Sequence, residues 1–331
     1  MGSRFFRDIA FRAHVRISFG QNGIPGDSRL PITLSGVTAR FNLGACGKGQ
    51  RAMAMSIREE RAIAQKYIGG FPWVIVVWGP GGFLLWLSLW PLTHTGQLPL
   101  WLGCIVASII LSACYLPTHE AQHGNIGRPN TSLRWFNELI GHVSVFPLIF
   151  PYHLHRAIHL EHHAHANNPD RDPDIYMKAD SIWGAAKNAW LSKQPGHTGS
   201  LADDVPEDNP QKERLIVEAI LVTRLAWILM ALLAWSGFAL EVLTLWWIPR
   251  QIAGIYTPVT LSWAPHYPMQ ETGGYRDTRG WKSPVGTIPS SGMEYHLVHH
   301  LFPSIPLNRT PAAYLELKPL LEAERVIMNG L

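Results

Sequence analysis

Residues 71–92 read FPWVIVVWGPGGFLLWLSLWPL, a run without a charged side chain. A bilayer core about 30 Å thick takes about 20 residues of helix, so this run is long enough to cross a membrane. Three more apolar runs of similar length follow at 98–116, 215–236 and 238–260. Short turns separate the first run from the second, at 93–97, and the third from the fourth, at Ser236 and Gly237. The sequence therefore predicts an all-α integral membrane protein with four transmembrane helices in two hairpins.

Loop charge predicts the orientation of these hairpins. Both short turns lack Lys and Arg, whereas Arg51, Arg58, Arg61 and Lys66 precede the first run. By the positive-inside rule the turns lie outside, and both termini and the long polar segments lie in the cytoplasm. We expect a bacterial inner-membrane protein with a helical cap on its cytoplasmic side. The net charge of +4 suits anionic lipid headgroups, and no Arg-rich run indicates nucleic acid binding.

Nine of the sixteen histidines fall into four groups that follow the apolar runs or lie between the two hairpins. These are His119 and His123; His159, His162 and His163; His266; and His296, His299 and His300. Side chains three or four residues apart share one face of a helix, so the members of a group converge. Neutral imidazole is a common metal ligand, and nine nitrogens are too many for one ion. The predicted topology places all nine on the cytoplasmic side, which indicates a site for two metal ions in the cap.

A zinc site is the first alternative. The segment His119-Glu120-Ala121-Gln122-His123 matches the HExxH pattern of metalloproteases, in which two histidines bind zinc and the glutamate is the base. A catalytic zinc ion needs only three protein ligands and an open position for water. An intramembrane zinc metalloprotease would therefore leave most of the nine histidines without a role.

The longer motifs are more specific. His159-Leu160-Glu161-His162-His163 runs into AHANNPDRDPD, and His296-Leu297-Val298-His299-His300 runs into LFPSIP. With these two HxxHH boxes, the HxxxH box and the isolated histidine of SWAPH, the chain resembles the integral-membrane fatty acid desaturase superfamily, over about residues 68–320. The match is closest in form to its acyl-lipid desaturase and carotenoid hydroxylase branches.

This resemblance implies a di-iron centre that activates O2 against an unactivated C–H bond of a lipid. Carried over by position, its iron ligands would be His119, His123, His159, His162, His163, His266, His296, His299 and His300. Ligating histidines commonly donate their second N–H to a carboxylate or a carbonyl. The adjacent candidates for that role are Glu120, Glu161, Asp172, Asp174 and Glu294.

The resemblance leaves the reaction open. We expect desaturation of a long-chain fatty acyl lipid in the bilayer, with hydroxylation of a β-carotene-type carotenoid ring as the alternative. A membrane protein that only stores metal is a third possibility. The sequence has neither a GxGxxG fingerprint nor a cysteine cluster, so we expect an external electron donor, a ferredoxin or a cytochrome, to dock on the basic inner face.

Four other features complete these predictions. Residues 1–52 show no helical periodicity, and we expect a disordered or non-native extension before a desaturase-like domain at 53–331. Residues 132–150 predict an interfacial or re-entrant helix rather than a fifth span, and 181–191 predict an amphipathic helix in a polar loop. Arg250 lies at membrane depth, where charge is unfavourable. It should therefore contact a glutamate, a backbone carbonyl or a polar part of the substrate.

Overall fold

The computed structural model describes residues 29–34, 37–42, 48–194 and 205–329 of the chain. The chain divides into two compact units, Met1–Glu59 and Glu60–Leu331. In the first unit β1 (Arg29–Leu34) and β2 (Val37–Asn42) form an antiparallel pair. Helix α1 (Lys48–Tyr67) starts in this unit and ends in the second. Most of the predicted extension at 1–52 lies outside the described residues, so this boundary stays a prediction.

Three segments of the described chain are long and apolar enough to cross a membrane: Trp73–His94, Leu100–Gln122 and Lys212–His266. The first is α2 (Trp73–His94), and the second joins α3 (Leu100–Ala113) to α4 (Tyr115–Gln122). The third, of 55 residues, contains α8 (Lys212–Leu233), α9 (Ala239–Glu241), α10 (Ile248–Pro258) and α11 (Ala264–His266), linked by the π-helical turns η4 (Ala234–Phe238), η5 (Val242–Trp247) and η6 (Val259–Trp263). A helical membrane protein is thereby confirmed.

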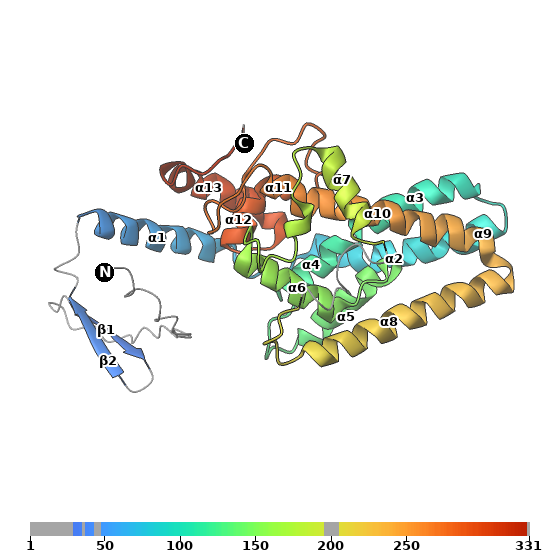
Figure 1. Cartoon of the computed structure of the whole chain (residues 1–331), viewed down its shortest axis with the longest axis horizontal. Coiled ribbons are helices and arrows are strands. Elements are labelled where there is room, and N and C mark those ends of the chain that lie inside the picture. Colours follow the sequence, from blue (N-terminus) through green and yellow to red (C-terminus); the bar gives the residue numbers. More distant parts are fainter. Residues whose placement is uncertain (1–28, 35–36, 43–47, 195–204, 330–331) are drawn as a thin grey trace, which may run out of the picture. The chain divides into compact units, whose positions relative to one another are not determined.

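The third segment is not one straight helix. Gly237 has φ 99° and ψ 0°, a conformation that only glycine adopts readily, and it interrupts the helical backbone where the sequence predicts a break. Figure 1 shows the chain turning back at this point, so that α8 leads toward the turn and α9 and α10 lead away from it. The rings of Trp227 on α8 and Trp247 on η5 lie 5.4 Å apart between their centroids.

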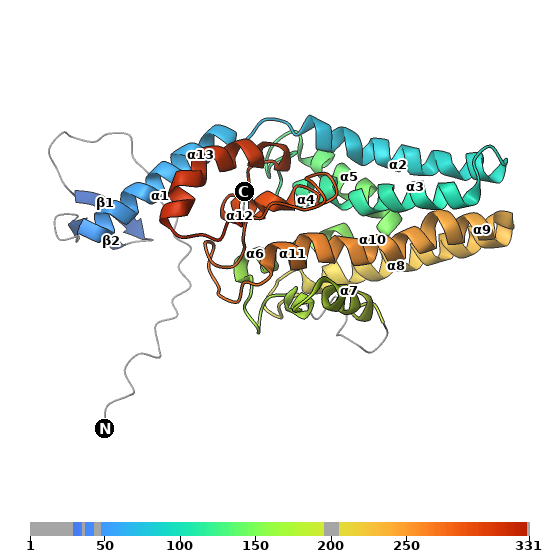
Figure 2. The same cartoon turned by 90° about the horizontal axis from the view of Figure 1, so that it is seen from above.

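The remaining helices surround one end of these long segments. They are α5 (Arg134–Val145), η2 (Phe146–Leu148), α6 (Tyr152–His165), η3 (Ile175–Met177), α7 (Ile182–Leu191), η7 (Met293–Tyr295), α12 (His296–Leu301), η8 (Leu307–Arg309) and α13 (Thr310–Ala323). In Figure 2, α6, α12 and α13 gather at the end of α2, α3 and α10 where α11 and α4 also lie. The predicted helices at 132–150 and 181–191 correspond to α5 and α7. Ser181 caps the start of α7, since its hydroxyl accepts the N–H of Gly184.

Two buried tryptophans fix the long helices to one another. The indole N–H of Trp86 on α2 donates to the carbonyl of Leu245 on η5 at 2.8 Å. The indole N–H of Trp246 donates to the carbonyl of Pro147 on η2 at 2.7 Å, and the two rings meet edge to face with centroids 5.3 Å apart. A buried N–H without a partner is strongly unfavourable in an apolar medium. These bonds therefore specify how α2, η5 and η2 pack.

A histidine bridge joins α5, α6 and α8. His153 Nδ1 lies 2.8 Å from a carboxylate oxygen of Glu218, and its Nε2 lies 2.7 Å from one of Glu138. Glu138 also pairs with Arg134 at 2.6 Å. His142 completes a group of possible metal ligands with His153 and Glu218, but both nitrogens of His153 already have carboxylate partners. We read this group as a structural ion-pair cluster.

This bridge should make stability depend on pH. The hydrogen bond to Glu138, together with the one to Glu218, raises the pKa of His153 against the opposing effect of burial. The contribution of protonated His153 to the free energy of unfolding is therefore complete below the unfolded-state pKa of about 6.5. This contribution is lost as pH rises through the higher folded-state pKa. We expect His153→Gln to lower the free energy of unfolding by about 1 kcal/mol at pH 5.5 and by less at pH 8.5. Thermal unfolding in detergent at both pH values measures this, and an equal loss at both would contradict it.

Candidate metal centre

The nine histidines predicted as ligands gather into two groups. The first group contains His119, His123, His159, His163 and His299, and the second contains His162, His266, His296 and His300. Within each group, one ligand nitrogen of every histidine lies within 4.8 Å of the others. Residues from four separate helices thus converge on two adjacent points. This is the arrangement that a pair of metal ions requires.

Helix geometry explains how each HxxHH box serves both groups. On α6, His159 and His163 are four residues apart and join the first group, whereas His162 joins the second. On α12 the roles are exchanged: the i, i+4 pair joins the second group, and His299 joins the first. Successive residues are about 100° apart around a helix, so the i and i+4 side chains stay together while the i+3 side chain points to a neighbouring position.

The cap holds α12 in place through apolar packing. Leu297 and Val298 lie between His296 and His299 and are fully buried in one apolar cluster with Leu317 and Leu321 of α13. Ala64, in the part of α1 that belongs to the second unit, packs into the same cluster. The apolar side of α12 thus faces α13, which leaves its histidines to face the metal groups.

Nitrogen atoms meet one another inside the groups. The Nε2 atoms of His123 and His159 are 2.8 Å apart, and those of His163 and His299 are 3.0 Å apart. Both ring nitrogens of His119 and of His296 are buried and have no hydrogen-bond partner within the described residues. A buried polar group without a partner costs about 1–3 kcal/mol. A cation in each group would bind these lone pairs, so the donor set fits two metal ions.

The protonation states also suit metal binding. Burial first, and neighbouring imidazoles second, hold the pKa of His159, His163 and His299 well below the usual value for histidine. These rings are neutral at pH 7, which is the form that ligates metals. His162 differs, because Asp174, Asp172 and Asp277 outweigh the effect of burial and raise its pKa.

Two of the nine histidines are oriented through their Nδ1 atom. His162 Nδ1 lies 2.8 Å from Asp172 Oδ1 and 3.9 Å from Asp174 Oδ2. Asp172 is itself fixed, because its oxygens accept the backbone N–H groups of Asn167 at 2.7 Å and of Asp174 at 2.9 Å. His266 Nδ1 donates to the backbone carbonyl of Asp277 at 2.9 Å. Each contact leaves Nε2 free to point into its group.

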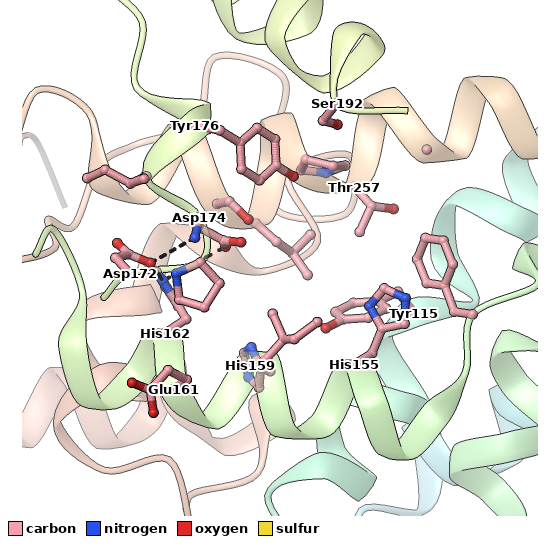
Figure 3. Close-up of a pocket in the computed structure, with 18 of the residues that line it drawn as sticks. Tyr115, His155, His159, Glu161, His162, Asp172, Asp174, Tyr176, Ser192 and Thr257 are labelled. Carbon is pink, nitrogen blue, oxygen red and sulfur yellow. Dashed lines mark hydrogen bonds and ion pairs between the residues drawn. The ribbon is translucent and has the colours of Figure 1, made fainter. Parts of the chain in front are cut away.

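The three glutamates predicted for the same role bind other groups. Glu120 accepts the backbone N–H of Leu307 at 2.8 Å. Glu294 accepts the backbone N–H of Ser283 at 3.1 Å. Glu161 lines the cavity beside His159 and His162 (Figure 3), and its carboxylate pairs with Arg171 at 2.6 Å. These carboxylates hold the segments around the site rather than a ligand ring.

Asp277 contacts two of the nine histidines and was not predicted from the sequence. Besides the bond from His266, its carboxylate lies 4.0 Å from His300 Nδ1. It is buried in the irregular segment that follows α11, and no motif marks it. Ser262, which lines the same cavity, hydrogen-bonds Asp174.

A cavity of about 950 Å³ opens onto both groups. Its walls include His119 and His159 of the first group and His162 and His296 of the second. Apolar side chains cover much of the remainder: Ile149, Phe150, Ile158 and Leu261. In Figure 3, Tyr176, Ser192 and Thr257 lie across the cavity from His155 and His159. His155 belongs to neither group, and its ring stacks on Phe150 at 4.3 Å.

Comparison with known proteins agrees with this geometry. The family described as "Fatty acid desaturase" matches residues 95–331. The chain is 22% identical over 249 residues to an sn-1 oleoyl-lipid 12-desaturase from Picosynechococcus sp., covering 67% of this chain and 69% of that protein. It is 24% identical over 240 residues to an sn-1 acyl-lipid omega-3 desaturase (ferredoxin) from Nostoc sp., covering 63% and 64% of the two chains. A shorter match, 32% over 101 residues, covers 26% of this chain and 31% of Beta-carotene 4-ketolase 3 from Haematococcus lacustris.

Proposed function

Since the chain belongs to the fatty acid desaturase family and is an oxidoreductase of lipid metabolism, we propose that it desaturates the acyl chain of a membrane lipid with O2 and two iron ions. The observation that carries this proposal is the cavity, because ligand histidines of both groups line it beside apolar side chains. The nine histidines His119, His123, His159, His162, His163, His266, His296, His299 and His300 would hold the iron ions.

Iron bound there would supply the oxidation of an unactivated C–H bond by O2. The protein holds the acyl chain against the histidine groups and keeps the reacting carbons away from water, which suppresses side reactions. The reaction removes two hydrogens from adjacent carbons, and O2 accepts them with two further electrons and two protons to give two waters. The electrons must come from outside. We propose a ferredoxin-type donor, as in the name of the Nostoc relative, with a cytochrome as the comparison in the assay.

We further propose that the chain crosses the bilayer four times, in two hairpins. A helix of 55 residues would extend about 82 Å, well over twice the bilayer core of about 30 Å. The interruption at Gly237 lies near the middle of this segment. We propose a bacterial inner membrane as the location, and the charge of the flanking segments supports an orientation with the metal centre and both termini in the cytoplasm. Protease accessibility of a C-terminal tag in sealed inverted vesicles tests this orientation.

The reaction is tested in one expression host that is fed both fatty acids and β-carotene. We expect acyl chains that are lighter by two hydrogens, and about two equivalents of iron in the purified protein. Mass spectrometry of lipid extracts and elemental analysis measure these outcomes. A carotenoid that gains oxygen would favour the alternative reaction instead. One equivalent of zinc with no lipid product would favour a metalloprotease.

A further inference from the structure

The charge of the side chains that line the cavity differs between the part near the histidines and the part away from them. Its carboxylates lie around His162, where Asp172 and Asp174 contact that ring. Its two basic residues outside that region are Lys193, which follows α7, and Arg250 on α10. In Figure 3, Ser192, the chain neighbour of Lys193, lies across the cavity from His155. The cavity therefore has an acidic, metal-binding part and a basic part.

One face of α10 and its continuation joins these two parts. Arg250, Gly254, Thr257 and Leu261 all line the cavity, and their spacing of four, three and four residues places them on one helical face. From Arg250 to Leu261 the helix advances about 16 Å. His266, of the second metal group, follows a little more than one turn later. A long, narrow ligand lying along this face would reach from the basic part to the metal groups.

The two cations lie close together without a matching anion. The ammonium of Lys193 lies so near Gly254 that a Cβ at this position would overlap it. Desolvation, and then the nearby Arg250, lower the pKa of Lys193 to about 8. Arg250 Nε donates to the carbonyl of Leu148 at 2.9 Å, and its guanidinium lies 5.9 Å from the ring of Trp227. Among the described residues, no carboxylate forms an ion pair with either cation.

We propose that Lys193 and Arg250 bind the anionic head of the lipid substrate, a phosphate or a carboxylate, and thereby direct its acyl chain along α10 to the histidine groups. The inference rests on the proposed function, of which it names the substrate class. Two neighbouring cations repel one another, and Arg250 is in addition partly buried, so an anionic group between them relieves the repulsion and gives Arg250 a charged partner. An uncharged carotenoid would leave the pair unmatched.

Direct binding tests this subsite without catalysis. The purified iron-loaded protein is kept free of O2 and titrated with three probes that carry the same acyl chain: a phosphatidylglycerol, a galactosyl diacylglycerol and the free fatty acid. Native mass spectrometry or displacement of a fluorescent lipid gives each Kd. We expect the wild type to bind an anionic probe about tenfold more tightly than the galactolipid. The ratio of the phosphatidylglycerol to the fatty acid tells whether phosphate or carboxylate is preferred.

Three variants assign the effect to the subsite. Lys193→Met removes the ammonium, and Gly254→Ala keeps the charge but displaces it, because the new Cβ overlaps only the flexible end of Lys193. Both should lose about tenfold in affinity for the preferred anionic probe and less than about twofold for the galactolipid. Lys187→Met, which removes an exposed cation from α7, should change neither value. Arg250 is left intact because it also ties α10 to Leu148.

Two results would overturn the proposal: a wild type that does not distinguish the charged from the uncharged probe, or variants that weaken both equally. These results are independent of turnover. If the anionic preference is present but no double bond forms when O2 and a donor are supplied, the subsite stands and the proposed reaction is wrong. If desaturation proceeds without that preference, the reaction stands and the subsite is wrong.

Discussion

His299→Gln is expected to lower desaturation by more than about a hundredfold and to reduce the iron content from about two equivalents to about one. His299 is buried in the first group, with its Nε2 3.0 Å from that of His163. Loss of a group that merely orients a ligand already costs about 10–100-fold in metal affinity or activity, so loss of a ligand should cost more. The second group does not contain His299, so it should keep its ion.

Elemental analysis of the purified variant and gas chromatography of acyl products measure the two effects. The matched control is His165→Gln, which removes a histidine from the same helix as three of the ligands but from neither group. His165 lies 3.4 Å from Glu161, and its loss should leave both the iron content and the product yield close to wild type. If His299→Gln kept two equivalents of iron, the assignment of His299 to the first group would be wrong.

The two histidine groups could be predicted from sequence because the convergence of their side chains depends on local helix geometry. An HxxHH box on a helix must direct its i and i+4 histidines to one side and its i+3 histidine to a neighbouring position. Both boxes do so, on α6 and on α12. The membrane-spanning helices could be predicted as well, because the length and composition of the apolar runs alone indicate them. The break at Gly237 followed from the shift in composition between two such runs.

The partners of the ligands were harder to predict because neighbours in sequence point in different directions. Glu161 precedes His162 by one residue, so on a helix its side chain is rotated by about 100° and meets Arg171 instead. The residues that contact ligand rings come from segments without helical periodicity: Asp172 from the loop after α6, and Asp277 from the segment after α11. Only the folded chain brings such segments to the site. For the same reason the sequence does not predict that Lys193 lies near Arg250, since the two residues are 57 positions apart in the chain.

Asp172→Asn should have the second largest effect, a loss of about 10–100-fold in turnover with a weaker hold on iron in the second group. The carboxylate of Asp172 lies 2.8 Å from His162 Nδ1 and accepts two backbone N–H groups, so it is rigidly placed. A neutral amide gives the ring a weaker acceptor, and if its NH2 group turns toward Nδ1, it opposes the tautomer in which Nε2 faces the metal. His162 should then bind its ion less tightly while the fold persists.

This orienting role can be separated from a structural one. Iron retention during dialysis against a chelator should fall first in the second group, to about one equivalent, while the thermal unfolding of the iron-free protein stays close to that of wild type. Asp172→Glu, which restores a carboxylate on a longer chain, should recover part of the turnover, and Asp180→Asn, an exposed carboxylate beyond the same loop, should resemble wild type. If Asp172→Asn unfolded as readily with iron as without it, or if Asp172→Glu recovered nothing, the residue would act by holding its loop, through the N–H groups of Asn167 and Asp174, rather than by orienting His162.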